Sequence, residues 1–308
     1  MANTYGKVSG TFQEADQVYG KVSGTWEEVD EIYAKDSGTW ELVFSAFEAT
    51  SYVTLSSGSG TFAVPDQANA IHIQAAVGAG GGSVDGADYD KAGGESSGAG
   101  GGSGAYISDK VFSVTGGETL SYSIGSGGAK GSGSIYNQTA SGGGSTTLSG
   151  STSGSLFSLT GGGGSSGTGG GVQGPLRTNT AGTAGSATIS GTAITSGNFR
   201  DSDGTQKAVT SNTSGPVGTF NQSGSGASGS NPGNCGGDNC QIGGGNGAAS
   251  YAGNISGGAG SPVGTYTNGA PGTRGSGAGG GGAQYASNKT LGNSGGNGEI
   301  KYRFLKVN

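Results

Sequence analysis

The chain has 308 residues, of which 74 are glycine and only 30% are hydrophobic, so it cannot bury a core in proportion to its length. Its net charge of −6 and its pI of about 4.7 offer no basic surface for nucleic acid. The longest apolar stretch, residues 71–77, is too short to insert across a membrane, and no signal peptide is recognisable, so we expect synthesis in a cytoplasm.

The first 46 residues contain a 14-residue repeat. Segments 5–12, 19–26 and 33–40 each read as a strand, a Ser-Gly turn and a second strand, and they end on Phe12, Trp26 and Trp40. One such unit is too small to fold alone. The three units either pack as a small sheet around these aromatic residues or dock on three equivalent sites of a trimeric partner, which the count of three favours.

Three later segments alternate apolar and polar residues: 70–77, 118–124 and 299–307. Alternation is typical of half-buried strands and argues against the disorder that so much glycine otherwise indicates. We expect a small β scaffold built from 60–77, 105–124 and 299–308, in which strands 70–77, 110–115, 118–124 and 299–307 form one structure.

Glycine-rich runs occupy much of the remaining chain, without the Gly-X-Y period of collagen. Polyproline II has three residues per turn, so side chains at every third position form one row and leave two faces of bare backbone for close contact. The sequence predicts a bundle of such helices, nearly pure glycine inside and with outward side chains outside. The spaced residues are Ser126, Ala129 and Ser132; Ser165 and Thr168; and Ser294, Asn297 and Ile300. The runs are 78–83, 93–104, 125–133, 141–145, 160–171, 224–230, 243–249, 256–261, 275–283 and 292–298.

These motifs resemble those of phage tail proteins. The Tyr-x-Lys-x-Ser-Gly-Thr-Trp units are similar to repeats common in such proteins, and segments 60–77 and 111–128 resemble the glycine-rich domain of tail-fibre proteins. The whole plan is similar to the distal tail-fibre adhesins of T-even-like phages. The resemblance implies a mostly β and irregular fold, with an attachment module over 1–46 and a glycine-rich adhesin domain over 47–308. The central stretch 172–222, where glycine is sparse, departs from that plan.

Chain direction predicts which loops lie far from the scaffold. The first run leaves the scaffold at Val77 and the second returns by Ala105, so loop 84–92 lies at the far end, and the same parity places 134–140 and 284–291 there. Polar loops 198–222 and 231–241 are candidates for the same end. The expected receptor-binding residues are Tyr89, Asp88, Asp90, Tyr136, Asn137, Tyr285, Asn288, Phe199 and Phe220.

The resemblance also implies the partners. Phe12, Trp26 and Trp40 would attach one copy of the chain to a trimeric tail-fibre protein, and the far end would bind an outer-membrane protein or a glycan of the host. The protein would then belong to the virion, at the distal end of the tail or its fibre. A structural tail component without receptor contact and a polysaccharide-degrading tail protein are the alternatives.

Nothing in the sequence predicts catalysis, a cofactor or a metal site. His72, the only histidine, is expected to face solvent or an interface, and Asp85, Asp88, Asp90, Asp201 and Asp203 are expected in solvated loops. Cys235 and Cys240 either form a small disulfide ring or remain free thiols.

Overall fold

The computed structural model describes residues 5–8, 11–14, 19–22, 24–29, 31–36, 39–45, 47–85, 87–89, 94–96, 98–134, 137–168, 178–210, 241–242, 272, 283–284, 288–289 and 291–308. These residues form strands, turns and extended segments and include no α-helix, which confirms the predicted mostly β and irregular fold class. In particular, the described part of the chain holds no helix with the length and apolarity needed to span a membrane.

The repeats at the N-terminus form three antiparallel hairpins, as predicted. Each hairpin is its own two-stranded sheet, so the repeats do not join into a common sheet. Gly24 in the second Ser-Gly turn has a φ of 92°, a conformation that glycine adopts without strain. The paired strands are β1 (Tyr5–Val8) with β2 (Thr11–Glu14), β3 (Tyr19–Val22) with β4 (Thr25–Glu28), and β5 (Glu31–Asp36) with β6 (Thr39–Ser45).

Two antiparallel sheets form the scaffold. The first has the order β12-β9-β26-β7, with β7 (Val53–Leu55), β9 (Ala70–Val77), β12 (Tyr106–Ser113) and β26 (Glu299–Leu305). The second has the order β20-β17-β16-β13-β8, with β8 (Ser59–Ala63), β13 (Thr119–Ser123), β16 (Thr146–Gly150), β17 (Gly154–Leu159) and β20 (Ala187–Ile189). The predicted strand 118–124 therefore lies in a different sheet from the other three predicted strands, because it pairs with β8 and β16.

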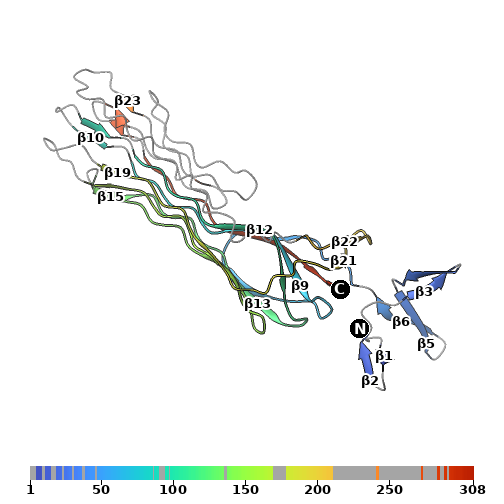
Figure 1. The fold of residues 1–308 in the computed structure, drawn as a ribbon. Coiled ribbons are helices and arrows are strands. Elements are labelled where there is room, and N and C mark those ends of the chain that lie inside the picture. The colour runs from blue at the N-terminus through green and yellow to red at the C-terminus, as the bar shows by residue number, and fades with distance from the viewer. Residues whose placement is uncertain are drawn as a thin grey trace.

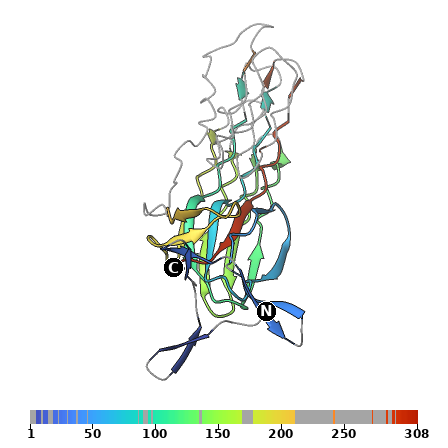
Figure 2. The ribbon, with the colours of Figure 1, turned by 90° about the vertical axis from the view of Figure 1, so that its right-hand side faces the viewer.

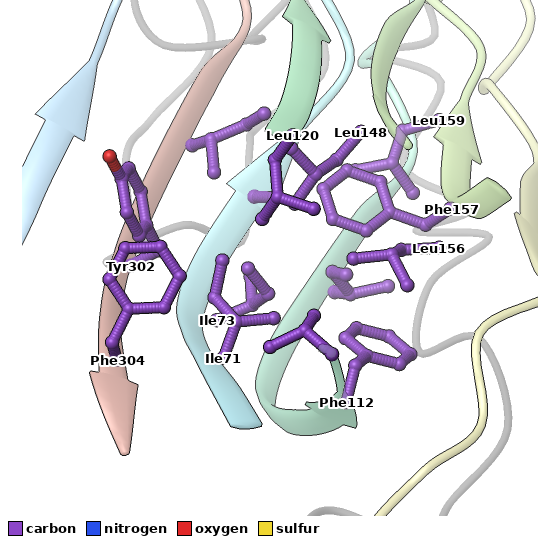
Figure 3. Close-up of a cluster of buried hydrophobic side chains, with 14 of the residues drawn as sticks. Ile71, Ile73, Phe112, Leu120, Leu148, Leu156, Phe157, Leu159, Tyr302 and Phe304 are labelled. Carbon is purple, nitrogen blue, oxygen red and sulfur yellow. The ribbon is translucent and has the colours of Figure 1, made fainter. Parts of the chain in front are cut away.

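The hydrophobic core lies where side chains from the two sheets meet (Figure 3). Ile71 and Ile73 of β9 face it, as do alternate residues of β26 (Ile300, Tyr302 and Phe304), which explains the period of two in these parts of the sequence. Phe62 of β8 stacks on Tyr302 of β26, with ring centroids 4.6 Å apart. The largest fully buried side chains of the core are Ile71, Ile73, Ile107, Phe112, Leu120, Leu148, Leu156, Phe157, Leu159 and Ile300.

The first glycine run and the residue after it, together segment 78–84, are buried along their whole length, and successive residues bond to different neighbouring segments in turn. The N–H groups of residues 78, 81 and 84 donate to segment 99–105, those of 79 and 82 to segment 141–144, and those of 80 and 83 to segment 292–298. Its carbonyls at 79 and 82 accept from segment 160–165, and those at 80 and 83 accept from segment 125–131. Every third residue faces the same neighbour, as polyproline II geometry requires.

The order of these bonds gives the direction of each run. Segments 99–105, 141–144 and 292–298 run antiparallel to 78–84, whereas 125–131 and 160–165 run parallel to it. Segment 181–186 is antiparallel to 160–165, so it also returns towards the sheets. The described runs thus form a bundle that extends from the scaffold (Figures 1 and 2).

Bare backbone faces hold this bundle together. A Cβ atom on Gly101 would overlap the carbonyl oxygen of Gly81, and one on Gly102 would overlap that of Thr183. Glycine is therefore required at these positions because another chain occupies the place of a side chain.

Side chains on the outer run 125–131 confirm the predicted three-residue row. Ser126, Ala129 and Ser132 are exposed, whereas the glycines that directly precede them, at 125, 128 and 131, are buried. Ser294 and Asn297 are exposed in the same way. The rule fails at Ser165, which is buried between runs, and at Ile300, which belongs to β26 and the core.

Short strands occur beyond the runs and beside the scaffold. The hairpin of β21 (Asn198–Arg200) and β22 (Gln206–Ala208) bonds to the C-terminus through Asn198 and Asn308. The other short strands are β10 (Ala87–Tyr89), β11 (Gly94–Ser96), β14 (Ser132–Ser134), β15 (Asn137–Thr139), β18 (Ser166–Thr168), β19 (Thr178–Thr180), β23 (Gln241–Ile242), β24 (Ala283–Gln284) and β25 (Asn288–Lys289).

Candidate functional site

Three small antiparallel sheets lie at the end of the bundle that is far from the scaffold. They are β10-β11, β14-β15-β18-β19 and β23-β24-β25, and Figure 1 places β10, β15, β19 and β23 together at that end. Strands β10 and β11 contact β24, although about 190 residues separate them in the sequence. The return of alternate runs to the scaffold therefore gathers separate connections at one end, as chain direction predicts.

Several predicted residues belong to these strands. Asp88 and Tyr89 are in β10, where Tyr89 pairs with Gly94 as the last residue before the hairpin connection. Asn137 begins β15 and is exposed, and Asn288 begins β25. Strand β10 contacts β25 as well as β24, so the backbones that carry Tyr89 and Asn288 are brought together, while β15 belongs to a separate sheet at the same end.

Other predicted residues lie outside the described residues. They include Tyr136, in the two-residue connection between β14 and β15, and Tyr285, in the connection between β24 and β25. Asp90, Phe220, Cys235 and Cys240 also lie outside them.

Phe199 differs from its predicted place. It is in β21 at the scaffold and is only 7% exposed, packed with Val111 and Leu305 rather than displayed at the far end. The guanidinium of Arg303 lies 5.3 Å from the centre of its ring. The reason is that segment 193–209 docks against the outer face of the first sheet, a contact with strands distant in sequence that the local pattern does not contain.

A buried polar cluster centred on Asp85 lies where the glycine runs meet the far-end strands. Asp85 is 6% exposed, and its carboxylate accepts the Gly292 N–H at 2.8 Å and the Gln138 amide at 2.9 Å. The Asp85 N–H donates in turn to the Gln138 side-chain oxygen at 3.0 Å. Asp85 is thus buried and bonded rather than solvated, because three runs end around it.

Two buried serines extend this cluster. The Ser165 hydroxyl donates to the Ala99 carbonyl at 2.7 Å and accepts the Val84 N–H at 3.1 Å. The Ser83 hydroxyl accepts the Asn293 N–H at 2.8 Å. The sequence did not predict this cluster, because its only local signal is a carboxylate immediately after the glycine run and the residues Ser83-Val84.

A family model for the glycine-rich domain matches residues 54–305, most of the chain and all of the bundle. The chain belongs to this glycine-rich domain family. No curated protein matches it. The three hairpins of the N-terminus precede the glycine-rich domain.

The scaffold end of the glycine-rich domain carries a group of charges. Arg303 Nη1 lies 2.6 Å from Asp201 Oδ1, and Lys207 forms a second ion pair with the same carboxylate. Hydrogen bonding to Lys207 lowers the pKa of Asp201 to about 2, and Arg303 and the Ser202 N–H act in the same direction, against the effect of burial. Asp201 is therefore an ion-paired anchor, while Asp203 is exposed as expected.

His72 lies on the outer face of β9 but is largely covered. Its Nδ1 is hydrogen-bonded to the Tyr52 hydroxyl at 3.0 Å, and its Nε2 lies 3.6 Å from Asp109. Burial, and then the positive charge of Arg303, lowers the pKa of His72. The residue thus packs beneath the segment that enters the glycine-rich domain, where sequence analysis expected a solvent or interface position. Among the described residues, no three His, Cys, Asp or Glu side chains gather as metal ligands would.

The hairpins that precede the glycine-rich domain share one backbone register. Phe12 pairs with Lys7, Trp26 with Lys21, and Trp40 with Lys35. The three aromatic positions are therefore equivalent in the backbone of each hairpin.

Proposed function

We propose that this protein is a phage tail-fibre tip adhesin that binds a host surface receptor through connections held at the far end of its glycine bundle. The observation that carries the proposal is the return of alternate runs to the scaffold, which gathers connections distant in sequence at one end. Because the runs contact each other through backbone atoms, the connections can vary in sequence without changing a side-chain core.

The resemblance of the sequence to distal tail-fibre adhesins supports the same function, and the glycine-rich domain family agrees with the scaffold that this resemblance implies. The equivalent registers of the hairpins suit attachment to three equivalent sites of a trimeric fibre, with one copy of the chain per fibre. The protein would then be part of the virion, at the distal end of the fibre, and its receptor would be an outer-membrane protein or a glycan.

Adsorption of phage with altered far ends tests this function. Tyr89→Ala, Tyr136→Ala and Tyr285→Ala are each expected to slow adsorption to host cells, because tyrosine supplies a large contact area to an interface at low entropic cost. Thr61→Ala, an exposed change on β8 of the scaffold, is the control and should adsorb like the wild type.

Normal adsorption by all three tyrosine variants would contradict the proposal and favour a structural tail component. Purified protein should also be tested on host cells with and without surface polysaccharide, since loss of binding with the polysaccharide identifies a glycan receptor. Release of saccharide fragments by the purified protein would instead indicate a degrading enzyme.

A further inference from the structure

Asp85 joins all three connections that chain direction places at the far end. It begins the connection that contains β10 and β11, accepts from Gln138 in the connection that contains β14 and β15, and accepts from Gly292, where the chain returns after β24 and β25. Gly292 is 207 positions away in the sequence, and Gln138 is 53 positions away. One buried carboxylate therefore links its own connection to the two others through two hydrogen bonds.

The hydrogen-bond donors around residue 85 require a side chain with two acceptor oxygens, as a carboxylate has. Along the run 292–298, the N–H groups of Gly295 and Gly298 donate to carbonyls of segment 125–131, whereas at Gly292 the acceptor is Asp85 Oδ1. The second oxygen, Oδ2, accepts from Gln138, whose own oxygen is taken by the Asp85 N–H. The two side chains are thus matched donor to acceptor, and both are buried.

We propose that Asp85 and Gln138 form a clasp that fixes the relative positions of the three far-end connections, so that they act as positioning residues for receptor recognition. The recognition part of this inference rests on the proposed function. The hydroxyls of Ser165 and Ser83 form hydrogen bonds to the backbone next to the clasp, and these bonds fix the ends of the runs from which the connections leave.

Exchanging the two chemical groups tests the clasp. In Asp85→Asn, the one remaining side-chain oxygen must accept the Gly292 N–H. The new NH2 group then faces the NH2 group of Gln138, so two donors oppose each other. Rotating the Gln138 amide by half a turn would offer its oxygen to the new amide. Its NH2 group would then face the backbone N–H of residue 85, which is again a donor against a donor. In Gln138→Glu, two carboxylates face each other. The double variant Asp85→Asn with Gln138→Glu restores an acceptor at 138 for both donors of residue 85, at the same total charge.

The experiment uses the four full-length proteins, with host-cell binding, thermal unfolding and hydrogen exchange of segments 84–98, 132–140 and 284–292 as readouts. Each single variant is expected to bind host cells about tenfold more weakly or worse and to exchange faster in all three segments. The double variant is expected to recover slow exchange and to bind within about threefold of the wild type.

Single variants that bind and exchange like the wild type would overturn the clasp, and so would a double variant that is no better than the two single changes combined. Wild-type protein that does not bind host cells would contradict the proposed function instead. In that case recovery of slow exchange in the double variant would still support the clasp, and unchanged exchange in every variant would overturn it.

Discussion

At the residue scale, Asp201 shows how one carboxylate fastens a peripheral hairpin to the sheet. It lies in the turn between β21 and β22, is largely buried, and pairs with Arg303 on β26. Because Lys207 and Arg303 stabilise its charged form, folding favours the ionised state. The contact holds β21, and with it Phe199, against the outer face of the first sheet.

The Asp201 ion pairs should make stability depend on pH in the acid range. A carboxyl whose pKa is lowered on folding stabilises the protein above its unfolded pKa of about 4, and this contribution is lost as pH falls towards its folded pKa of about 2. Asp201→Asn should cost on the order of 2 kcal/mol at pH 7, a difference that shrinks between about pH 4 and pH 2. Urea unfolding at several pH values measures it.

The control for this change is Asp203→Asn, in the same turn but exposed. It should change the free energy of unfolding much less than Asp201→Asn does, because solvent screens an exposed ion pair. An equal loss in both variants, or a loss for Asp201→Asn that does not vary with pH, would contradict the interpretation.

Glu118 has a related role in the turn between β16 and β17. Its buried carboxylate accepts the N–H groups of Thr115, Thr152 and Ser153 at 2.7 to 3.0 Å. Burial acts to raise the pKa of Glu118, but these backbone hydrogen bonds and the Ser153 hydroxyl together lower it. Glu118→Ala should cost on the order of 3 kcal/mol, because partly buried N–H groups lose their acceptor.

Thr152→Ala is the matched control in that turn, since it removes an exposed side chain and keeps the backbone N–H. Thermal unfolding should show a clear fall in melting temperature for Glu118→Ala and little change for Thr152→Ala. A small effect of Glu118→Ala would mean that solvent replaces the carboxylate at no cost.

At the element scale, each glycine run depends on its neighbours rather than on its own side chains. A polyproline II helix has no internal hydrogen bonds, so the N–H groups of the run 78–84 depend on carbonyls of other runs. The bundle is therefore stabilised by hydrogen bonds and close contacts between the backbones of neighbouring runs, which must approach each run on several sides.

Substitution at Gly101 tests this close packing. Gly101→Val, or the milder Gly101→Ala, would push a Cβ atom into the Gly81 carbonyl and should lower stability by about 3 kcal/mol or more. Gly142→Ala is the matched control, because the nearest atom to its new Cβ is 3.3 Å away, and it should cost no more than about 1 kcal/mol. Equal melting temperatures for Gly101→Val and the wild type would disprove the close-packed bundle.

At the scale of the whole molecule, the chain combines a part that resembles an attachment module with a glycine-rich domain whose far end is distant from its scaffold. If the hairpins attach the protein to a fibre, Trp26→Ala and Trp40→Ala should each release it from the particle, because large aromatic residues dominate interface energy. The glycine-rich domain should keep its melting temperature. Quantifying the protein on purified particles measures release, and full retention by both variants would contradict this role.

The sequence by itself determined the local features and their order. The 14-residue repeat predicted the hairpins because a Ser-Gly turn and its flanking strands are set by adjacent residues. The three-residue row of Ser126, Ala129 and Ser132 predicted polyproline II geometry, and chain direction predicted that the three connections lie at one end. The hairpins and the three-residue row depend only on neighbouring residues. The place of each connection depends only on how many times the chain has run between the scaffold and the far end.

Only the tertiary structure decided which distant segments meet. Strand 118–124 alternates like its neighbours in sequence, yet its pairing with β8 and β16 places it in the second sheet. Phe199 is buried because a far segment docks on the first sheet, and Asp85 is bonded because Gly292, 207 positions later, returns beside it. Such contacts form because packing together surfaces that are far apart along the chain is favourable. A local sequence pattern contains no information about which distant surfaces will meet.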